Sequence, residues 1–323
     1  MRRNLFIGFL IGFGLATAIV PLFTKLKPEE GDKSQASNSY PFLARRIFAD
    51  NPNDLIINFT QLRNQVKDYI NTQDVRIGFY FEYLPTGLSI GVKEQEAFYR
   101  ASLVKLPIVM KAYKLIEEGK IDKDEVLKIT KDDIDQGYGD LWKEGRSEIT
   151  LSEAINLALT KSDNTAFRVI NSRVDRELTV SGNEIEKAIT EIYNYLDIPL
   201  DSRGYTESIT PKGYGSIFKS LFFSAYLNYD NSSEVLNQLS HSIFRDWMPK
   251  SIPENVVVAH KTGTFDLEKS IYSVHSDCGI VYYPNRPYLI CIMVNSNDLD
   301  ISLKHINYLS ELVFNYIDDI NAK

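Results

Sequence analysis

Predicted β-strands lie towards both ends of the sequence, and a long stretch of helical patterns separates them. Residues 75–84 and 87–92 predict an early hairpin around Pro85-Thr86-Gly87. Residues 256–258 and two segments around Pro284 predict three late strands. Because a lone hairpin is only marginally stable, we expect the early and late strands to join one antiparallel sheet. This arrangement predicts an α+β fold with helices flanking the sheet and an all-helical part inserted between its strands.

The expected domain covers residues 41–323, with an α/β part at about 41–100 and 212–323 and a helical part at about 101–211. A helix is expected to begin at Asp54, and a second amphipathic helix closes the chain. Apolar residues recur at helical spacing in both segments: Leu55, Phe59, Leu62, Val66 and Ile70 in the first, and Ile306, Leu309, Val313, Tyr316 and Ile320 in the second.

The first 24 residues predict a membrane signal-anchor. Residues 5–23 carry no charge, and Arg2 and Arg3 precede them. A stretch of this length can just span a bilayer, and the arginines orient the N-terminus towards the cytoplasm. Residues 25–40 are polar and predict a linker, which leaves the main domain extracytoplasmic. The alternative is cleavage at Ala16-Thr17-Ala18, which would release a secreted protein.

Composition narrows the range of partners and cofactors that the chain can have. The net charge of −7 argues against a nucleic-acid partner, which requires a basic face. The two cysteines, Cys278 and Cys291, cannot form a metal-ligand set, and the sequence implies no metal and no organic cofactor. If Tyr283 faces Tyr288 across the turn at Pro284, the cysteines lie diagonally, and we expect buried thiols. A register shifted by two residues would place them opposite each other.

Ser102-Leu103-Val104-Lys105 stands at the start of an apolar helical run. Residues three apart share one face of a helix, so Ser102 and Lys105 are expected to point into one pocket. A serine hydroxyl needs a base to act as a nucleophile, and a neutral lysine can be that base. Taken alone, the same pattern describes a helix cap and a solvated lysine. It also occurs a second time, at Ser216-Ile217-Phe218-Lys219.

Two further motifs follow the first one and do not follow the second. Ser162-Asp163-Asn164 begins 60 residues after Ser102, and Lys261-Thr262-Gly263 follows the strand at 256–258. Either triplet alone fits an ordinary helix cap or an edge-strand turn. The three motifs in this order predict a catalytic site that uses Ser102, Lys105, Ser162 and Lys261.

Each motif residue receives an expected role. Ser162 relays a proton to the leaving nitrogen, Asn164 binds a substrate amide, and Asp163 holds the loop. Burial and the charge of Lys261 are expected to lower the pKa of Lys105.

The third motif is expected to contact the substrate. Lys261 and Thr262 bind a carboxylate, and Gly263 allows close approach of the backbone. The N–H groups of Ser102 and Thr264 form an oxyanion hole.

These motifs resemble those of the class A β-lactamase-type serine hydrolases, within the wider penicillin-binding-protein superfamily. The resemblance covers about residues 54–320 and includes "FYRASLVKLPI", "KSDNTA" and "AHKTGT". "GYGDL", at residues 137–141, is similar to the loop that faces the active site in that family. "TPKGYGSIFKSL" resembles the helix that follows the Ω-loop, which implies that the second Ser-x-x-Lys is one turn of this helix.

The chain departs from the family in the Ω-loop. Class A β-lactamases carry Glu-x-x-Leu-Asn there, and the glutamate activates the deacylating water. The matching residues 195–211 have no such stretch, and the family's active-site arginine after Lys-Thr-Gly has no match. The resemblance therefore implies a β-lactam-opening hydrolase with impaired deacylation. A D-Ala-D-Ala peptidase acting on peptidoglycan peptides and a non-hydrolytic β-lactam sensor remain as alternatives.

Overall fold

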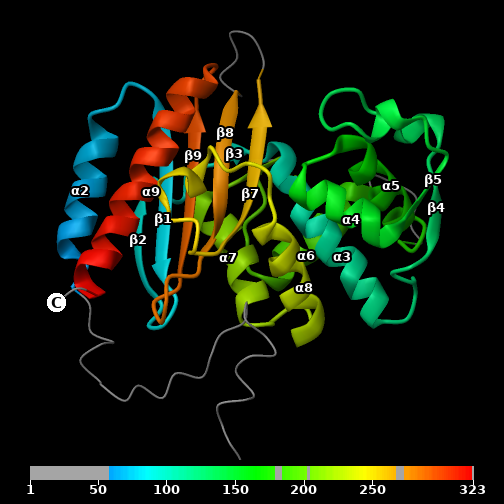
Figure 1. The fold of residues 1–323 in the computed structure, drawn as a ribbon, viewed down its shortest axis with the longest axis horizontal. Helices are drawn as coiled ribbons and strands as arrows, with labels where there is room; N and C mark the ends of the chain where they lie inside the picture. The colour runs from blue at the N-terminus through cyan, green and yellow to red at the C-terminus, as the bar shows by residue number, and fades with distance from the viewer. Residues whose placement is uncertain (1–57, 179–183, 202–203, 267–272, 322–323) are drawn as a thin grey trace, which may run out of the picture. The chain divides into compact units, whose positions relative to one another are not determined.

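Five antiparallel strands form the central sheet, in the order β2–β1–β9–β8–β7 (Figure 1). The computed structural model describes residues 58–178, 184–201, 204–266 and 273–321. The strands are β1 Arg76–Tyr83, β2 Leu88–Val92, β7 Val258–Phe265, β8 Val274–Val281 and β9 Tyr288–Asn295. β9 pairs with β1 along the whole length of both strands. The expected single sheet from the two ends of the domain is therefore confirmed.

Strand alternation gives the sheet two apolar faces. On β9, Tyr288, Ile290 and Ile292 point into one core, whereas Leu289 and Cys291 point into the other. The first face is covered by α2 (Thr60–Asn71) and α9 (Leu299–Asn321), and the second by α7 (Pro211–Phe222) and α8 (Tyr229–Ser240). A sheet buried on both faces reads as a continuous apolar run, which explains the sequence YLICIMV at residues 288–294.

The inserted part packs beside β7 (Figure 1). Its helices are α3 Lys105–Glu117, α4 Leu151–Thr160, α5 Asn164–Asp175 and α6 Glu184–Tyr195, and its short 3₁₀ helices are η3 Ala101–Val104, η4 Lys131–Asp133 and η5 Leu141–Glu144. It also contains the short strands β4 Val126–Lys128 and β5 Glu148–Thr150, which pair with each other. β6 (Ser208–Ile209) pairs with β3 (Phe98–Tyr99), and η6 is Met248–Ser251. Segments of two or three residues are too short to produce a periodic signal.

Two predicted boundaries need correction. Helix α2 begins at Thr60, because Asn58 and Phe59 are not helical, and the expected start at Asp54 lies outside the described residues. The first late strand runs from Val258 to Phe265, so the Lys-Thr-Gly triplet lies inside β7 rather than at its end. The polar and small residues of this strand hide it from a search for β-branched runs.

The prediction of two buried thiols is wrong. Cys278 and Cys291 form a disulfide between β8 and β9. In the observed register Val281, not Tyr283, faces Tyr288, and the two cysteines stand directly opposite each other. Turn length sets the register of a hairpin, and residues 282–287 form a longer loop than the sequence analysis assumed.

The predicted anchor and linker, residues 1–40, lie outside the described residues. Within the part of the chain that the structure describes, no helix has the length and apolar character needed to cross a membrane.

Candidate active site

Ser102 lies in the one-turn 3₁₀ helix η3, which leads directly into α3. We expected Ser102 at the N-terminus of the α-helix, but the α-helical part begins only at Lys105. The residue before it, Ala101, has a φ of +46°, in the left-handed region that costs a non-glycine residue energy. This turn exposes Ser102 to a pocket of about 530 Å³.

The pocket lies where η3, α5 and β7 meet. Its walls include three residues of the predicted site besides Ser102, namely Lys105, Asn164 and Thr264. The other lining residues are Tyr99, Ala101, Val104, Asp132, Asp133, Asp135, Phe167, Arg168, Asn171, Ser172 and Phe265. Residues of the first two motifs and the threonine that follows the third, all far apart in sequence, therefore meet at one cavity.

Lys105 is buried, and its amine contacts the second motif. Its Nζ donates to the carbonyl oxygen of Ser162, lies 3.2 Å from Ser162 Oγ and lies 2.7 Å from Asn164 Oδ1. Ser162 itself has a φ of +55°, which turns both its carbonyl and its hydroxyl towards the lysine. These contacts place Lys105 between the nucleophile turn and the residues expected to handle the leaving group.

Lys261 reaches the same hydroxyl from the other side. Its Nζ lies 3.0 Å from Ser162 Oγ and 2.9 Å from the carbonyl oxygen of Thr262. The Ser162 hydroxyl thus bridges the amines of Lys105 and Lys261. Lys261 is 1% exposed, so it lies behind the pocket wall rather than in it.

Burial controls the charge of both lysines. It lowers the pKa of Lys105 to about 7, while the carboxylates of Asp163 and Asp135 limit the fall. Burial also lowers the pKa of Lys261 well below its usual range, and the charge of Lys105 lowers it further. We expected the charge of Lys261 to lower the pKa of Lys105. In the structure it is the charge of Lys105 that lowers the pKa of Lys261.

Gly263 brings β7 against the nucleophile turn. A Cβ at this position would lie 2.8 Å from Leu103 Cγ and 3.3 Å from the carbonyl oxygen of Arg100. We expected the missing side chain of Gly263 to allow close approach of a ligand. In the structure it allows close packing of β7 against η3. Thr264 on the same strand lines the pocket, whereas Thr262 is 3% exposed and does not.

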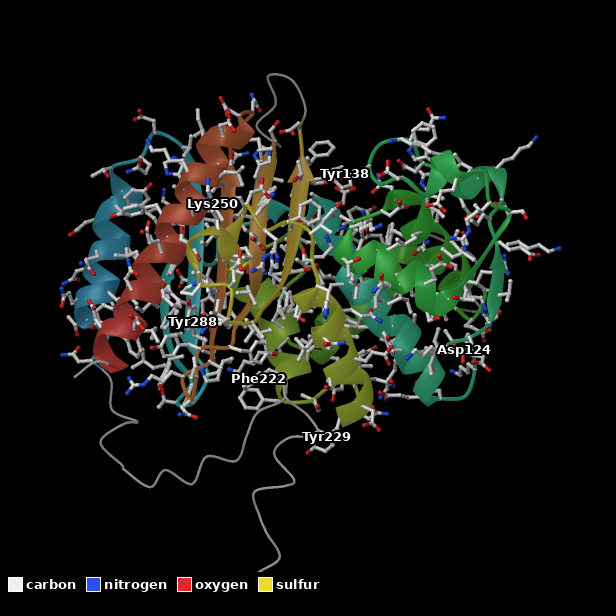
Figure 2. All side chains as sticks on the ribbon, in the orientation of Figure 1. Asp124, Tyr138, Phe222, Tyr229, Lys250 and Tyr288 are labelled. Carbon is white, nitrogen blue, oxygen red and sulfur yellow. A yellow bond between two sulfur atoms is a disulfide. The ribbon has the colours of Figure 1, made fainter. Side chains whose placement is uncertain are left out.

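Asp163 joins the second motif to residues 134–141. Its Oδ1 accepts from the N–H of Ala166 and caps α5, and its Oδ2 accepts from the N–H of Leu141. Asn164 N–H donates to the carbonyl oxygen of Tyr138 in the same loop. Figure 2 shows Tyr138 at the border between the sheet and the inserted part. The expected loop-holding role of Asp163 is confirmed.

A charged cluster lies behind the nucleophile turn and was not predicted from the sequence. The Arg100 guanidinium donates to Glu186 Oε1 (2.9 Å) and to the carbonyl oxygen of Thr206 (2.7 Å). Glu186 Oε2 accepts from the N–H (2.8 Å) and the hydroxyl (2.6 Å) of Thr206. This Arg100 cluster connects the chain before Ser102 to α6 and to the segment at 195–211. An arginine two residues before the motif serine was the only available signal.

The second Ser-x-x-Lys lies elsewhere. Ser216 and Lys219 belong to α7, whose N-cap is Thr210, and Lys219 forms an ion pair with Glu82. Among the described residues, no group of three or more His, Cys, Asp or Glu side chains is arranged to hold a metal ion.

Comparison with known proteins places this chain in a family. The model of a family described as "Beta-lactamase enzyme family" matches residues 61–317, which is most of the chain. The chain belongs to this family. Beta-lactamase VEB-1 of Pseudomonas aeruginosa is 19% identical over 277 residues, covering 78% of this chain and 89% of its own length. Beta-lactamase SME-1 of Serratia marcescens is 24% identical over 244 residues, covering 70% of this chain and 78% of its own.

Solved structures share the fold at low identity. PBP-A superposes with a TM-score of 0.69 and 24% identity, over 80% of this chain and 97% of that one. A β-lactamase from Chitinophaga pinensis superposes with a TM-score of 0.71 and 19% identity, over 80% of this chain and all of the other. The predicted α+β fold of the serine β-lactamases and penicillin-binding proteins is thereby confirmed, and family membership supports a hydrolase.

Proposed function

We propose that this member of the β-lactamase enzyme family is a serine hydrolase that opens β-lactam amides through an acyl-enzyme on Ser102. The observation that carries the proposal is that Ser102 and Lys105 line one cavity and that the buried amine of Lys105 lies 3.2 Å from the Ser162 hydroxyl behind its wall. A buried amine with a pKa of about 7 is partly neutral at physiological pH and can accept a proton.

The shared pocket of Ser102 and Lys105 and the contact of Lys105 with Ser162 support the following acylation step. Ser102 Oγ attacks the lactam carbonyl and transfers its proton to neutral Lys105. The carbonyl oxygen becomes an oxyanion next to the N–H groups of Ser102 and Thr264. When the C–N bond breaks, the proton passes from Lys105 through the Ser162 hydroxyl to the leaving nitrogen. The 3.2 Å separation of Lys105 Nζ and Ser162 Oγ allows this transfer without movement of either side chain.

One observation favours slow deacylation and keeps a D-Ala-D-Ala peptidase as the second candidate. The carboxylates of the segment at 195–211 are Asp197, Asp201 and Glu207, and none of them is among the described residues that line the pocket. A variant of the structurally similar PBP-A has been solved as an acyl-enzyme with penicillin G. A long-lived acyl-enzyme is compatible with a peptidase or with a β-lactam sensor.

The deciding experiment follows the mass of the intact full chain in detergent after mixing with penicillin G, while loss of the drug is measured in parallel. We expect an adduct of one penicillin that persists while little drug is lost. Rapid drug loss without an adduct identifies an efficient β-lactamase instead. Ser102→Ala is expected to abolish the adduct, and undiminished labelling of this variant would disprove the proposed nucleophile.

A further inference from the structure

Asp135 lies next to the second motif, on a loop fixed to α5 through its backbone. It follows η4, and its N–H donates to Thr165 Oγ1 at 3.0 Å. The Thr165 hydroxyl in turn lies 3.2 Å from the carbonyl oxygen of Asp135. Thr165 is completely buried, so these two contacts hold Asp135 at a fixed distance from the N-terminus of α5.

Both carboxylate oxygens of Asp135 are used. Oδ1 accepts from the N–H of Gly137 (2.8 Å) and from Asn164 Nδ2 (3.0 Å), and Oδ2 accepts from the Arg168 guanidinium (2.6 Å). Asn164 and Arg168 are four residues apart and share one face of α5. A Cβ on Gly137 would lie 3.0 Å from Asp135 Oδ1 and 3.2 Å from Asn164 Nδ2. The loop at Gly137 therefore packs directly onto the side chains of Asp135 and Asn164.

The orientation of the Asn164 amide depends on Asp135. Lys105 Nζ faces Asn164 Oδ1, but an amine that titrates near neutrality can donate or accept and so does not fix the amide. An ionised carboxylate only accepts. Burial alone would raise the pKa of Asp135, but the hydrogen bonds from Asn164 and Gly137 and the Arg168 charge lower it below its usual range.

We propose that Asp135 is a positioning residue that orients the Asn164 amide for substrates with an acylamino side chain. This inference rests on the proposed function. The carboxylate holds one N–H of Asn164 Nδ2, so the second N–H is directed to a substrate carbonyl in the pocket. The same orientation turns Asn164 Oδ1 towards Lys105. Without Asp135 the amide is free to rotate, and the substrate carbonyl loses its donor for part of the time, whereas a neutral Lys105 amine can contact either end of the amide.

The role predicts an effect that depends on the substrate. Penicillin G has an acylamino group, whereas penicillanic acid has the same bicyclic ring without one. We expect Asp135→Ala in the full chain to slow acylation by penicillin G by about 10- to 100-fold, the size typical of hydrogen bonds to a charged group. Acylation by penicillanic acid is expected to fall by less than about threefold on the same basis, because no substrate amide is present.

The charge of Asp135 separately predicts a pH effect for Asp135→Asn. The introduced amide can still accept from Asn164, so most of the rate with penicillin G is expected to return. The charge is lost, however, and Asp135 is one of two carboxylates that raise the pKa of Lys105, the other being Asp163. The amine of Lys261 lies on the other side of the Ser162 hydroxyl from Lys105 and is not altered by the substitution. The acid limb of the acylation rate should therefore move to lower pH.

Asp140→Asn is the matched control. It removes one negative charge from the same loop, is exposed and pairs only with Lys143 among its described contacts. It is expected to leave both rates and the pH profile unchanged.

Failure of the proposed function and failure of the positioning role are distinguishable. If the wild-type chain is not acylated, the proposed function fails. If it is acylated but Asp135→Ala slows both β-lactams equally, or neither, the positioning role is overturned. If Asp135→Ala does not fold, the two acylation rates of Asp135→Asn decide, and an equal loss of rate with penicillin G and with penicillanic acid overturns the inference.

Discussion

The Ser162 hydroxyl is the point at which the two buried lysines meet. Lys261 Nζ lies 3.0 Å from it and Lys105 Nζ lies 3.2 Å from it. Only Lys105 also lines the pocket that contains Ser102. The geometry therefore favours Lys105 as the base for Ser102 and leaves Lys261 as the partner that orients the Ser162 hydroxyl.

The charge state of Lys105 should set the pH dependence of acylation. Because burial lowers its pKa to about 7, Lys105 is protonated and inactive as a base below this pH and becomes neutral above it. We expect the rate constant for acylation by penicillin G to rise about tenfold per pH unit below pH 7 and to level off above it. Mass spectrometry of reactions quenched at successive times, between pH 5.5 and 9, measures this rate constant.

Lys105→Ala is the companion variant. It is expected to slow acylation by about 10²- to 10⁴-fold, the usual size of a general-base contribution, and to remove the limb near pH 7. A circular dichroism spectrum checks that the fold is kept. A loss of less than tenfold would assign the base role to another group, with Ser162 as the first candidate.

At the scale of elements, the Arg100 cluster joins η3 to α6 and to the segment at 195–211. The side chains of Arg100 and Glu186 are only 14% and 15% exposed. Hydrogen bonds to charged groups typically contribute about 1.5–3 kcal/mol, so Glu186→Gln should lower the free energy of unfolding by about this amount at pH 7. Urea denaturation measures the difference.

The effect of Glu186→Gln should depend on pH. Burial opposes ionisation of Glu186, but the hydrogen bonds from Thr206 and the Arg100 charge lower its pKa below the usual 4.5. The folded state then binds fewer protons than the unfolded state, so this contribution is present above pH 4.5 and is lost as the pH falls. The difference between wild type and variant should shrink towards pH 3. Glu144→Gln, at an exposed ion pair with Arg146, is the control and should change little.

Sequence spacing placed residues within a single element and missed most contacts between elements. Ser102 and Lys105 were expected to face one pocket because residues three apart share one side of a helical turn, and both line the same pocket. The disulfide depends on the register of β8 and β9. The turn length expected from the sequence was too short and placed the two cysteines diagonally instead of opposite each other. Asp135 and Glu186 carry no local signal, since their partners lie 29 and 86 residues away in sequence. The motif order supplied the long-range information that periodicity lacks.

At the scale of the whole molecule, all residues of the candidate site belong to the unit that runs from Phe42 to Lys323. The sheet is assembled from both ends of this unit, and β7 and η3 meet only when the two ends pair. The site therefore depends on the complete domain. Residues before it are expected to determine location and not chemistry.

This separation gives the last prediction, which compares the full chain with residues 41–323. The apolar stretch at 5–23 is 19 residues long and would span about 28 Å as a helix, close to the roughly 30 Å of a bilayer core. The full chain should sediment with membranes after ultracentrifugation, and the shorter chain should remain soluble. Both should be acylated by penicillin G at the same rate, within about twofold, because no general-base or oxyanion contact is lost. A soluble full-length product with a mass that begins after Ala18 would establish cleavage instead of anchoring. Slower acylation of the shorter chain would mean that residues 1–40 contribute to the site.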